Sequence, residues 1–149
     1  MRLFVSPIIF CFTFLSLPAL AVSVDVLCLT NLSGKSRGIE FRSYYDPGVK
    51  WSGAVARYEG STRVIPLISK YRQVDVVAPD RPYQETNIWW EVLDGRFTGE
   101  YEMVSQGSMV AHFSYTNYKS KTSFDYIRDP NVDFTETNGC AWQDRSKNG

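Results

Sequence analysis

The chain has 149 residues with 16 basic and 16 acidic side chains, so its formal net charge is zero. A neutral chain lacks the excess of Lys and Arg that drives general binding to nucleic acid or to anionic membranes. With 44% hydrophobic and 15% aromatic residues, the chain is also too apolar for a disordered tail. The composition therefore predicts a folded domain with a real core and excludes a polycationic binding protein.

The first 21 residues have the organisation of a secretory signal peptide. Met1-Arg2 is short and charged, the next 18 residues are apolar and uncharged, and Ala19-Leu20-Ala21 places small residues at positions −3 and −1 of a cleavage site. Cleavage would leave residues 22–149 as a single β domain with a net charge of about −1, because Arg2 is the only charge removed. We therefore predict an exported protein, periplasmic or extracellular, with no membrane insertion after cleavage.

Two cysteines, Cys28 and Cys140, would remain in the mature chain, because Cys11 lies within the signal peptide. An even pair of cysteines in an exported protein predicts a disulfide bond. The alternative, in which one cysteine stays reduced as a nucleophile beside His112, is disfavoured in an oxidising compartment. Asn31-Leu32-Ser33 also matches the N-glycosylation pattern, which would matter only in a eukaryotic source.

Short β-rich segments, separated by turn signals, follow one another from residue 23 onward. The expected strands are Ser23–Leu29, Gly38–Tyr45, Lys50–Tyr58, Thr62–Ser69, Lys70–Ala78, Asn87–Leu93, Arg96–Ser105, Ser108–Thr116 and Thr122–Arg128. Pro66 places its strand at an edge or beside a bulge, and Asp94-Gly95 predicts a tight hairpin. A polar tail from about residue 129 would be held by Cys140. The pattern predicts an all-β fold, an antiparallel barrel or sandwich of about eight or nine strands.

One segment carries a local resemblance to a known family. Residues 95–101 read GRFTGEY, which resembles the Gly-x-Phe-Thr-Gly-x-Tyr strand of the avidin family. The resemblance covers seven residues, and the family's early Trp-bearing strand is not found in the expected order. It implies an eight-stranded barrel with a ligand in its mouth.

No arrangement of residues predicts catalysis. His112 is the only histidine, and no nucleophile motif accompanies it. Glu100 and Glu102 lie two residues apart, so they share one face of a strand with Thr98, where solvated charge is ordinarily found. One histidine cannot complete a zinc site with two disulfide-bonded cysteines. We therefore expect a protein that is not an enzyme, with no metal and no cofactor.

Trp89 and Trp90 are neighbours in one predicted strand, so their side chains should point to opposite faces. The interpretation that places Trp90 in the core leaves Trp89 facing outward. The preceding loop Pro79–Tyr83 is stiffened by two prolines and carries Arg81 and Tyr83. Because Trp, Tyr and Arg dominate the energetics of protein interfaces, we predict that Arg81, Tyr83 and Trp89 bind a protein partner.

Two functions fit these features. The first is an exported binding module for another protein, such as an inhibitor or an immunity factor against a secreted toxin. The second is a barrel that binds a small apolar or aromatic ligand. A hydrolase is a third possibility with the least support. The first function places the aromatic side chains on loops and an outer face, whereas the second places them around an internal cavity.

Overall fold

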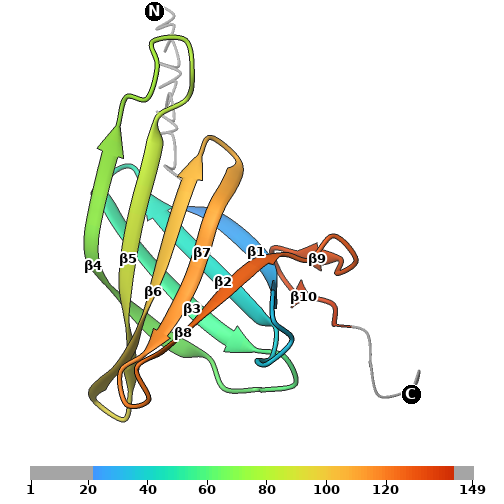
Figure 1. The fold of residues 1–149 in the computed structure, drawn as a ribbon. Helices are drawn as coiled ribbons and strands as arrows, with labels where there is room; N and C mark the ends of the chain where they lie inside the picture. Colours follow the sequence, from blue (N-terminus) through green and yellow to red (C-terminus); the bar gives the residue numbers. More distant parts are fainter. Residues whose placement is uncertain (1–21, 143–149) are drawn as a thin grey trace, which may run out of the picture.

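The computed structural model describes residues 22–142, so the predicted signal peptide lies outside the described residues. Eight antiparallel strands form a closed barrel in chain order, with β8 paired to β1 (Figure 1). The strands are β1 (Ser23–Asn31), β2 (Ile39–Asp46), β3 (Trp51–Tyr58), β4 (Ile65–Asp75), β5 (Gln84–Leu93), β6 (Arg96–Gln106), β7 (Met109–Asn117) and β8 (Thr122–Arg128). The all-β prediction is confirmed, and of its two architectures the barrel is the one adopted. Residues 22–142 contain no helix of the length and hydropathy that crossing a membrane requires.

The two expected strands between residues 62 and 78 are a single strand, β4 (Ile65–Asp75). Its pairing with β5 shifts register between Ser69 and Tyr71, which is a bulge. A bulge in this strand is one of the two alternatives that Pro66 predicts. The bulge interrupts the alternation of side chains, so one strand reads as two segments in the sequence. The predicted hairpin is confirmed, because Asp94 and Gly95 both have positive φ, 51° and 74°, between β5 and β6.

Aromatic rings fill the centre of the barrel. Phe41 lies with its ring centroid 5.0 Å from Trp89 and 5.1 Å from Phe113, both in edge-to-face geometry. Tyr101 completes the cluster and is fully buried. Edge-to-face rings at these separations stabilise a core beyond the area that they bury. The cluster therefore closes the middle of the barrel and separates its two ends.

The predicted orientation of the two tryptophans is wrong. Trp89 is only 4% exposed and lies in the barrel core, whereas Trp90 faces outward against Phe97, with ring centroids 4.7 Å apart. The prediction of the orientation failed because the inner face of β5 carries Glu91, a charged residue that hydropathy assigns to the surface. The outward face carries apolar Ile88, which hydropathy assigns to the core.

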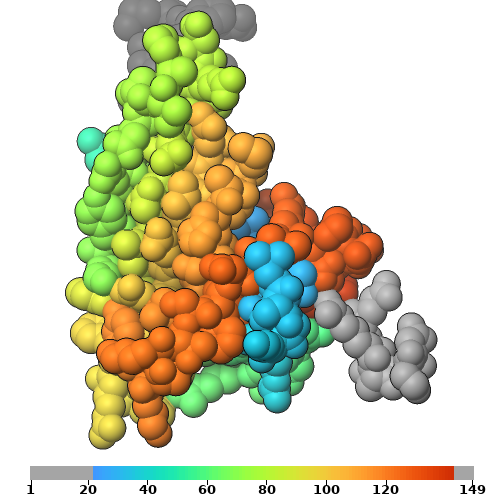
Figure 2. Space-filling view, in the orientation of Figure 1, coloured from blue at the N-terminus to red at the C-terminus, as the bar shows by residue number. Residues whose placement is uncertain are grey.

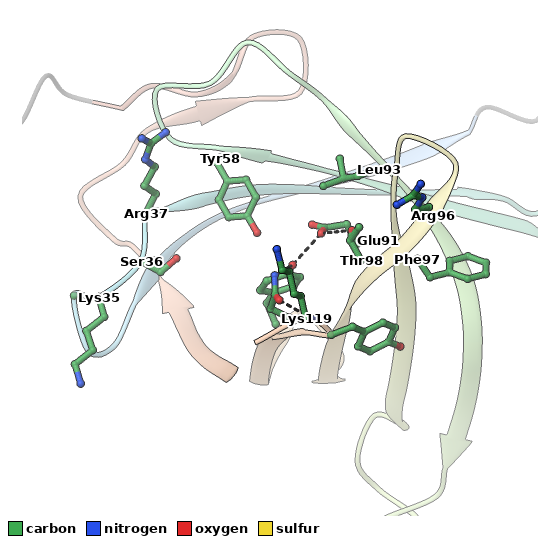
Figure 3. A pocket seen from close by; sticks show the side chains of 14 residues that line it. Lys35, Ser36, Arg37, Tyr58, Glu91, Leu93, Arg96, Phe97, Thr98 and Lys119 are labelled. Carbon is green, nitrogen blue, oxygen red and sulfur yellow. Dashed lines mark hydrogen bonds between the residues drawn. The ribbon is translucent and has the colours of Figure 1, made fainter. Parts of the chain in front are cut away.

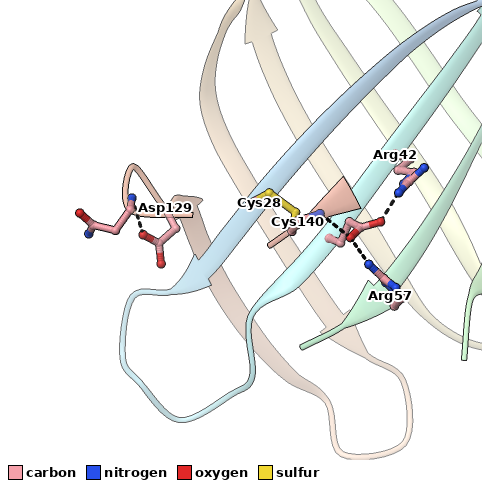
Figure 4. Close-up of a disulfide and its surroundings, with 7 residues drawn as sticks. Cys28, Arg42, Arg57, Asp129 and Cys140 are labelled. Carbon is pink, nitrogen blue, oxygen red and sulfur yellow. Dashed lines mark hydrogen bonds and ion pairs between the residues drawn. A yellow bond between two sulfur atoms is a disulfide. The ribbon is translucent and has the colours of Figure 1, made fainter. Parts of the chain in front are cut away.

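The polar tail forms a small hairpin that covers the outer face of β1. β9 (Phe134–Thr135) and β10 (Gly139–Cys140) make a two-stranded sheet beside the barrel. The Cys28–Cys140 disulfide, which the sequence predicts, joins this hairpin to β1 (Figure 4). Val26 and Val132 pack with the two cysteines in a second apolar cluster. From Val26 onward β1 is consequently mostly buried on both faces, toward the barrel interior and toward the tail.

A buried carboxylate lies beneath the tail. Glu40 is 3% exposed and accepts hydrogen bonds from the Cys140 backbone N–H at 2.8 Å, from Arg42 Nε at 2.7 Å and from Arg57 (Figure 4). Burial by itself would raise the pKa of Glu40, but these hydrogen bonds outweigh it and hold the pKa below its ordinary value of 4.5. Gly139 has a positive φ, and a Cβ there would overlap the Glu40 and Arg42 side chains. Glycine at 139 thus allows the tail to seat on the carboxylate.

Replacing Glu40 by Gln is expected to lower the free energy of unfolding by about 2 kcal/mol at neutral pH, because charge-assisted hydrogen bonds to both arginines are lost. A lowered folded-state pKa gives stability that is present above the unfolded pKa and is lost as the pH falls through the folded one. The difference between the two proteins should therefore be constant above about pH 5 and shrink below it. Urea unfolding from pH 3 to 7 measures this, and a difference independent of pH would contradict the assignment.

Candidate functional site

A cleft of about 1070 Å³ opens at the end of the barrel where β5 and β7 finish (Figure 3). The loop between β1 and β2, the β5–β6 hairpin and the β7–β8 loop surround it. Its lining residues are Gly34, Lys35, Ser36, Arg37, Tyr58, Glu91, Leu93, Arg96, Phe97, Thr98, Tyr115, Asn117, Tyr118 and Lys119. Four aromatic rings and Leu93 form the apolar part of the walls, and the charged side chains lie at different depths.

Glu91 forms the floor of the cleft and is only 2% exposed. Its carboxylate accepts hydrogen bonds from Thr98 Oγ1 at 2.7 Å, from Tyr115 Oη at 2.9 Å and from Tyr101 Oη at 2.9 Å. Tyr58 Oη lies 3.1 Å from Tyr101 Oη and extends this network. No Lys or Arg is paired with Glu91 within residues 22–142. A buried carboxylate held only by neutral hydroxyls is an uncommon and costly arrangement in a protein interior.

Two local features of β6 allow this network to form. The β5–β6 pairing shifts register at Glu91 and Val92, which leaves Thr98 as an extra residue whose side chain reaches Glu91. The expectation that Thr98 continues the outer face of Glu100 and Glu102 is therefore wrong. Next to it, a Cβ on Gly99 would lie 2.6 Å from the Tyr115 ring, so glycine there lets that ring approach.

Burial raises the pKa of Tyr58 to about 12, and the nearby Glu91 charge acts in the same direction. Burial is also the main cause that raises the pKa of Tyr101 and of Tyr115, with the charge of Glu91 adding to it. All three phenols consequently stay protonated at physiological pH. Tyr101 and Tyr115 act as hydrogen-bond donors toward the carboxylate, and none of the three phenols acts as a base.

Four cationic side chains stand around the mouth of the cleft: Lys35, Arg37, Arg96 and Lys119 (Figure 3). None of the four forms an ion pair within residues 22–142. Two of them lie on the loop between β1 and β2, which is fixed by buried Asn31 and by a 2.9 Å hydrogen bond from Tyr126 Oη to Ser36 Oγ. The mouth is therefore electropositive, while Glu91 is the sole carboxylate that lines the cleft.

The structure does not bring the three predicted binding residues together. Tyr83 is 62% exposed and Arg81 is exposed in the loop between β4 and β5, at the opposite end of the barrel from the cleft. Trp89 lies in the core instead of beside them. The loop stands out from the body of the molecule (Figure 2).

The residues considered for catalysis or modification are dispersed. His112 is exposed on β7, and Glu100 lies on the outer face, paired with Lys70 Nζ at 2.6 Å. Residues 22–142 contain no group of three His, Cys, Asp or Glu side chains that could hold a metal. Asn31 is buried and its side-chain amide donates to the Asp125 carbonyl at 3.0 Å, so the folded protein does not present it to a glycan-transferring enzyme.

Glu91 is the functional candidate that sequence reasoning missed. A lone glutamate between apolar residues in a strand is indistinguishable from a surface charge until the partners from β6 and β7 are in place. Tyr101 could have been found, because it ends the GRFTGEY segment. No protein-family model, curated protein or solved structure matches the chain significantly.

Proposed function

We propose that the protein binds a small organic molecule in the cleft around Glu91. The observation that carries the proposal is the buried carboxylate at the floor, which has hydroxyl neighbours but no cationic partner in residues 22–142. Such a group lowers the stability of the folded protein, so its presence indicates that it serves a function. A ligand that hydrogen-bonds to it supplies a reason for its presence.

The size and lining of the cleft support the same proposal. Ligand sites for small molecules are typically concave, about 300–1000 Å³ in volume, and lined by apolar and aromatic groups with a few polar ones. The cleft is of this order, with Tyr58, Leu93 and Phe97 on its walls. Six aromatic side chains are buried in the barrel core, and six others, among them Trp51 and Tyr83, are exposed.

The neutral dye N-phenyl-2-naphthylamine tests the proposal, because its fluorescence rises in apolar sites. We expect one dye molecule to bind per chain, and Leu93→Trp, which fills the cleft, to reduce the affinity at least about tenfold. Ile68→Trp adds the same ring to the outer surface of β4 and should leave binding unchanged. Circular dichroism confirms that both variants fold. Equal binding by the two variants would place the dye elsewhere and contradict the proposal.

Protein binding through the β4–β5 hairpin is a second candidate, and one observation favours it. β3 pairs with β4 only over Ile65–Leu67, so within residues 22–142 the rest of β4 has one unpaired edge. Apolar side chains, including Val74, Val76 and Tyr83, are exposed along the same hairpin. An exposed strand edge of this kind can accept an extended segment of another protein by strand addition.

The combined change Arg81→Ala and Tyr83→Ala tests the second candidate. If the hairpin binds a protein, each truncation should weaken the complex by about 1–3 kcal/mol without lowering the melting temperature, because both side chains are exposed. Affinity capture from the exported fraction with the wild-type chain identifies the partner, and calorimetry then compares the variants. Leu93→Trp is the control that should retain the partner. Unchanged affinity in the double variant would exclude these two residues as anchors.

A further inference from the structure

We propose that the ligand of the cleft is a bipolar organic anion, with an N–H or O–H donor at its inner end and an anionic group at its outer end. This inference rests on the proposed function and specifies the class of molecule that the cleft takes. It combines two independent features, the direction of the hydrogen bonds at the floor and the charge of the mouth.

The hydroxyl protons at the floor of the cleft already take part in hydrogen bonds within the protein. Thr98, Tyr101 and Tyr115 each direct their single proton to Glu91. Since the proton of Tyr101 is used in this way, the hydrogen bond between Tyr58 and Tyr101 must be donated by Tyr58.

The oxygens around Glu91 then offer only acceptor positions to a ligand, and the nearby Asn117 Nδ2 donates to Tyr115 Oη at 3.3 Å. Glu91 Oε1 accepts two hydrogen bonds, but Oε2 accepts only the one from Tyr101 and keeps a lone pair. The Tyr58 oxygen, having donated its proton, is also an acceptor. The inner end of the ligand must therefore donate hydrogen bonds, as an amine, amide, urea or hydroxyl does. A carboxylate or sulfonate at this depth would instead meet the charge of Glu91, with no cationic side chain of residues 22–142 paired with that carboxylate.

The outer end of the ligand faces the opposite charge. Lys35, Arg37, Arg96 and Lys119 line the mouth, and Glu91 is the only acidic residue among those that line the cleft. Asp94, in the same hairpin as Arg96, is paired with Arg63. Cations around an opening attract anions and raise their rate of entry. The separation of a negative floor from a positive rim thus selects a molecule with its donor inside and its anion outside.

Two dyes with the same ring system separate the parts of this inference. N-phenyl-2-naphthylamine and 6-anilinonaphthalene-2-sulfonate both carry an anilino N–H, and they differ in the sulfonate, which lies at the opposite end of the ring system from the N–H. We expect the sulfonate dye to bind at least about tenfold more tightly at low ionic strength, a ratio that salt reduces. Arg96→Gln with Lys119→Gln should bring the ratio close to one by weakening only the sulfonate dye. Arg81→Gln with Lys50→Gln removes the same charge at the other end of the barrel and should preserve the ratio.

Glu91→Gln tests the inner end and should weaken both dyes severalfold, whereas Glu102→Gln, on the outer face of β6, should weaken neither. Equal affinities of the two dyes, or a ratio that the rim variants do not change, would overturn the anionic half while leaving the proposed function intact. Unchanged affinities in Glu91→Gln would overturn the donor half. If neither dye binds the wild-type protein, or Leu93→Trp blocks neither, the proposed function itself fails.

Discussion

Replacing both Cys28 and Cys140 by Ser is expected to lower the free energy of unfolding by about 4–5 kcal/mol, because the disulfide closes a very long loop in the unfolded chain. The two cysteines are 112 residues apart in sequence, and both sulfurs are buried between β1 and the tail. Loss of the bond also releases β10, whose Cys140 N–H donates to Glu40. The expected loss of stability therefore has two sources, the greater entropy of the unfolded chain and the exposure of the Glu40 carboxylate to solvent. Urea unfolding of the wild-type and double-serine proteins measures it.

Reduction provides the matched control for this prediction. Wild-type protein unfolded in the presence of a reductant should have the same midpoint as the double-serine variant, which itself should not respond to the reductant. A single substitution, Cys140→Ser, should destabilise to a similar extent because it leaves no bond. A loss below about 1 kcal/mol would mean that the tail is held mainly by its other contacts.

The two adjacent tryptophans should respond very differently to truncation. Trp89→Ala removes a ring from the centre of the core, where it packs on Phe41, and should lower the free energy of unfolding by about 3–5 kcal/mol. Trp90→Ala removes a ring that stacks on Phe97 on the outer face of the barrel and lies under Lys70. Its cost should be about 1 kcal/mol or less, as for most surface substitutions. Chemical denaturation of the two variants side by side gives the comparison.

Tryptophan fluorescence supplies an independent readout for the same pair. Trp89 is shielded from solvent, so its removal should eliminate the blue-shifted part of the emission, whereas removal of Trp90 should leave that part intact. Similar losses of stability in the two variants would mean that both rings belong to the core. The reverse order of losses would restore the orientation expected from hydropathy.

The cleft illustrates how a site can be assembled from residues that look ordinary one at a time. Glu91 comes from β5, Thr98 and Tyr101 from β6, and Tyr115 from β7. Nothing in the local sequence marks any one of them as part of a site. The closure of the barrel places the four on one inner surface, because residues on neighbouring strands come into register there.

Local patterns in the sequence were enough to predict an all-β antiparallel fold, the Asp94-Gly95 hairpin and the Cys28–Cys140 bond. Alternation and turn residues act over a few positions, and a single pair of cysteines leaves one way to form a disulfide. The inward direction of Trp89 and the bulge that turns Thr98 toward Glu91 depended on the tertiary structure. The physical reason is that a strand shows which residues share a face, but its partners decide which face is buried. A charged residue is accepted inside only where groups distant in sequence satisfy it.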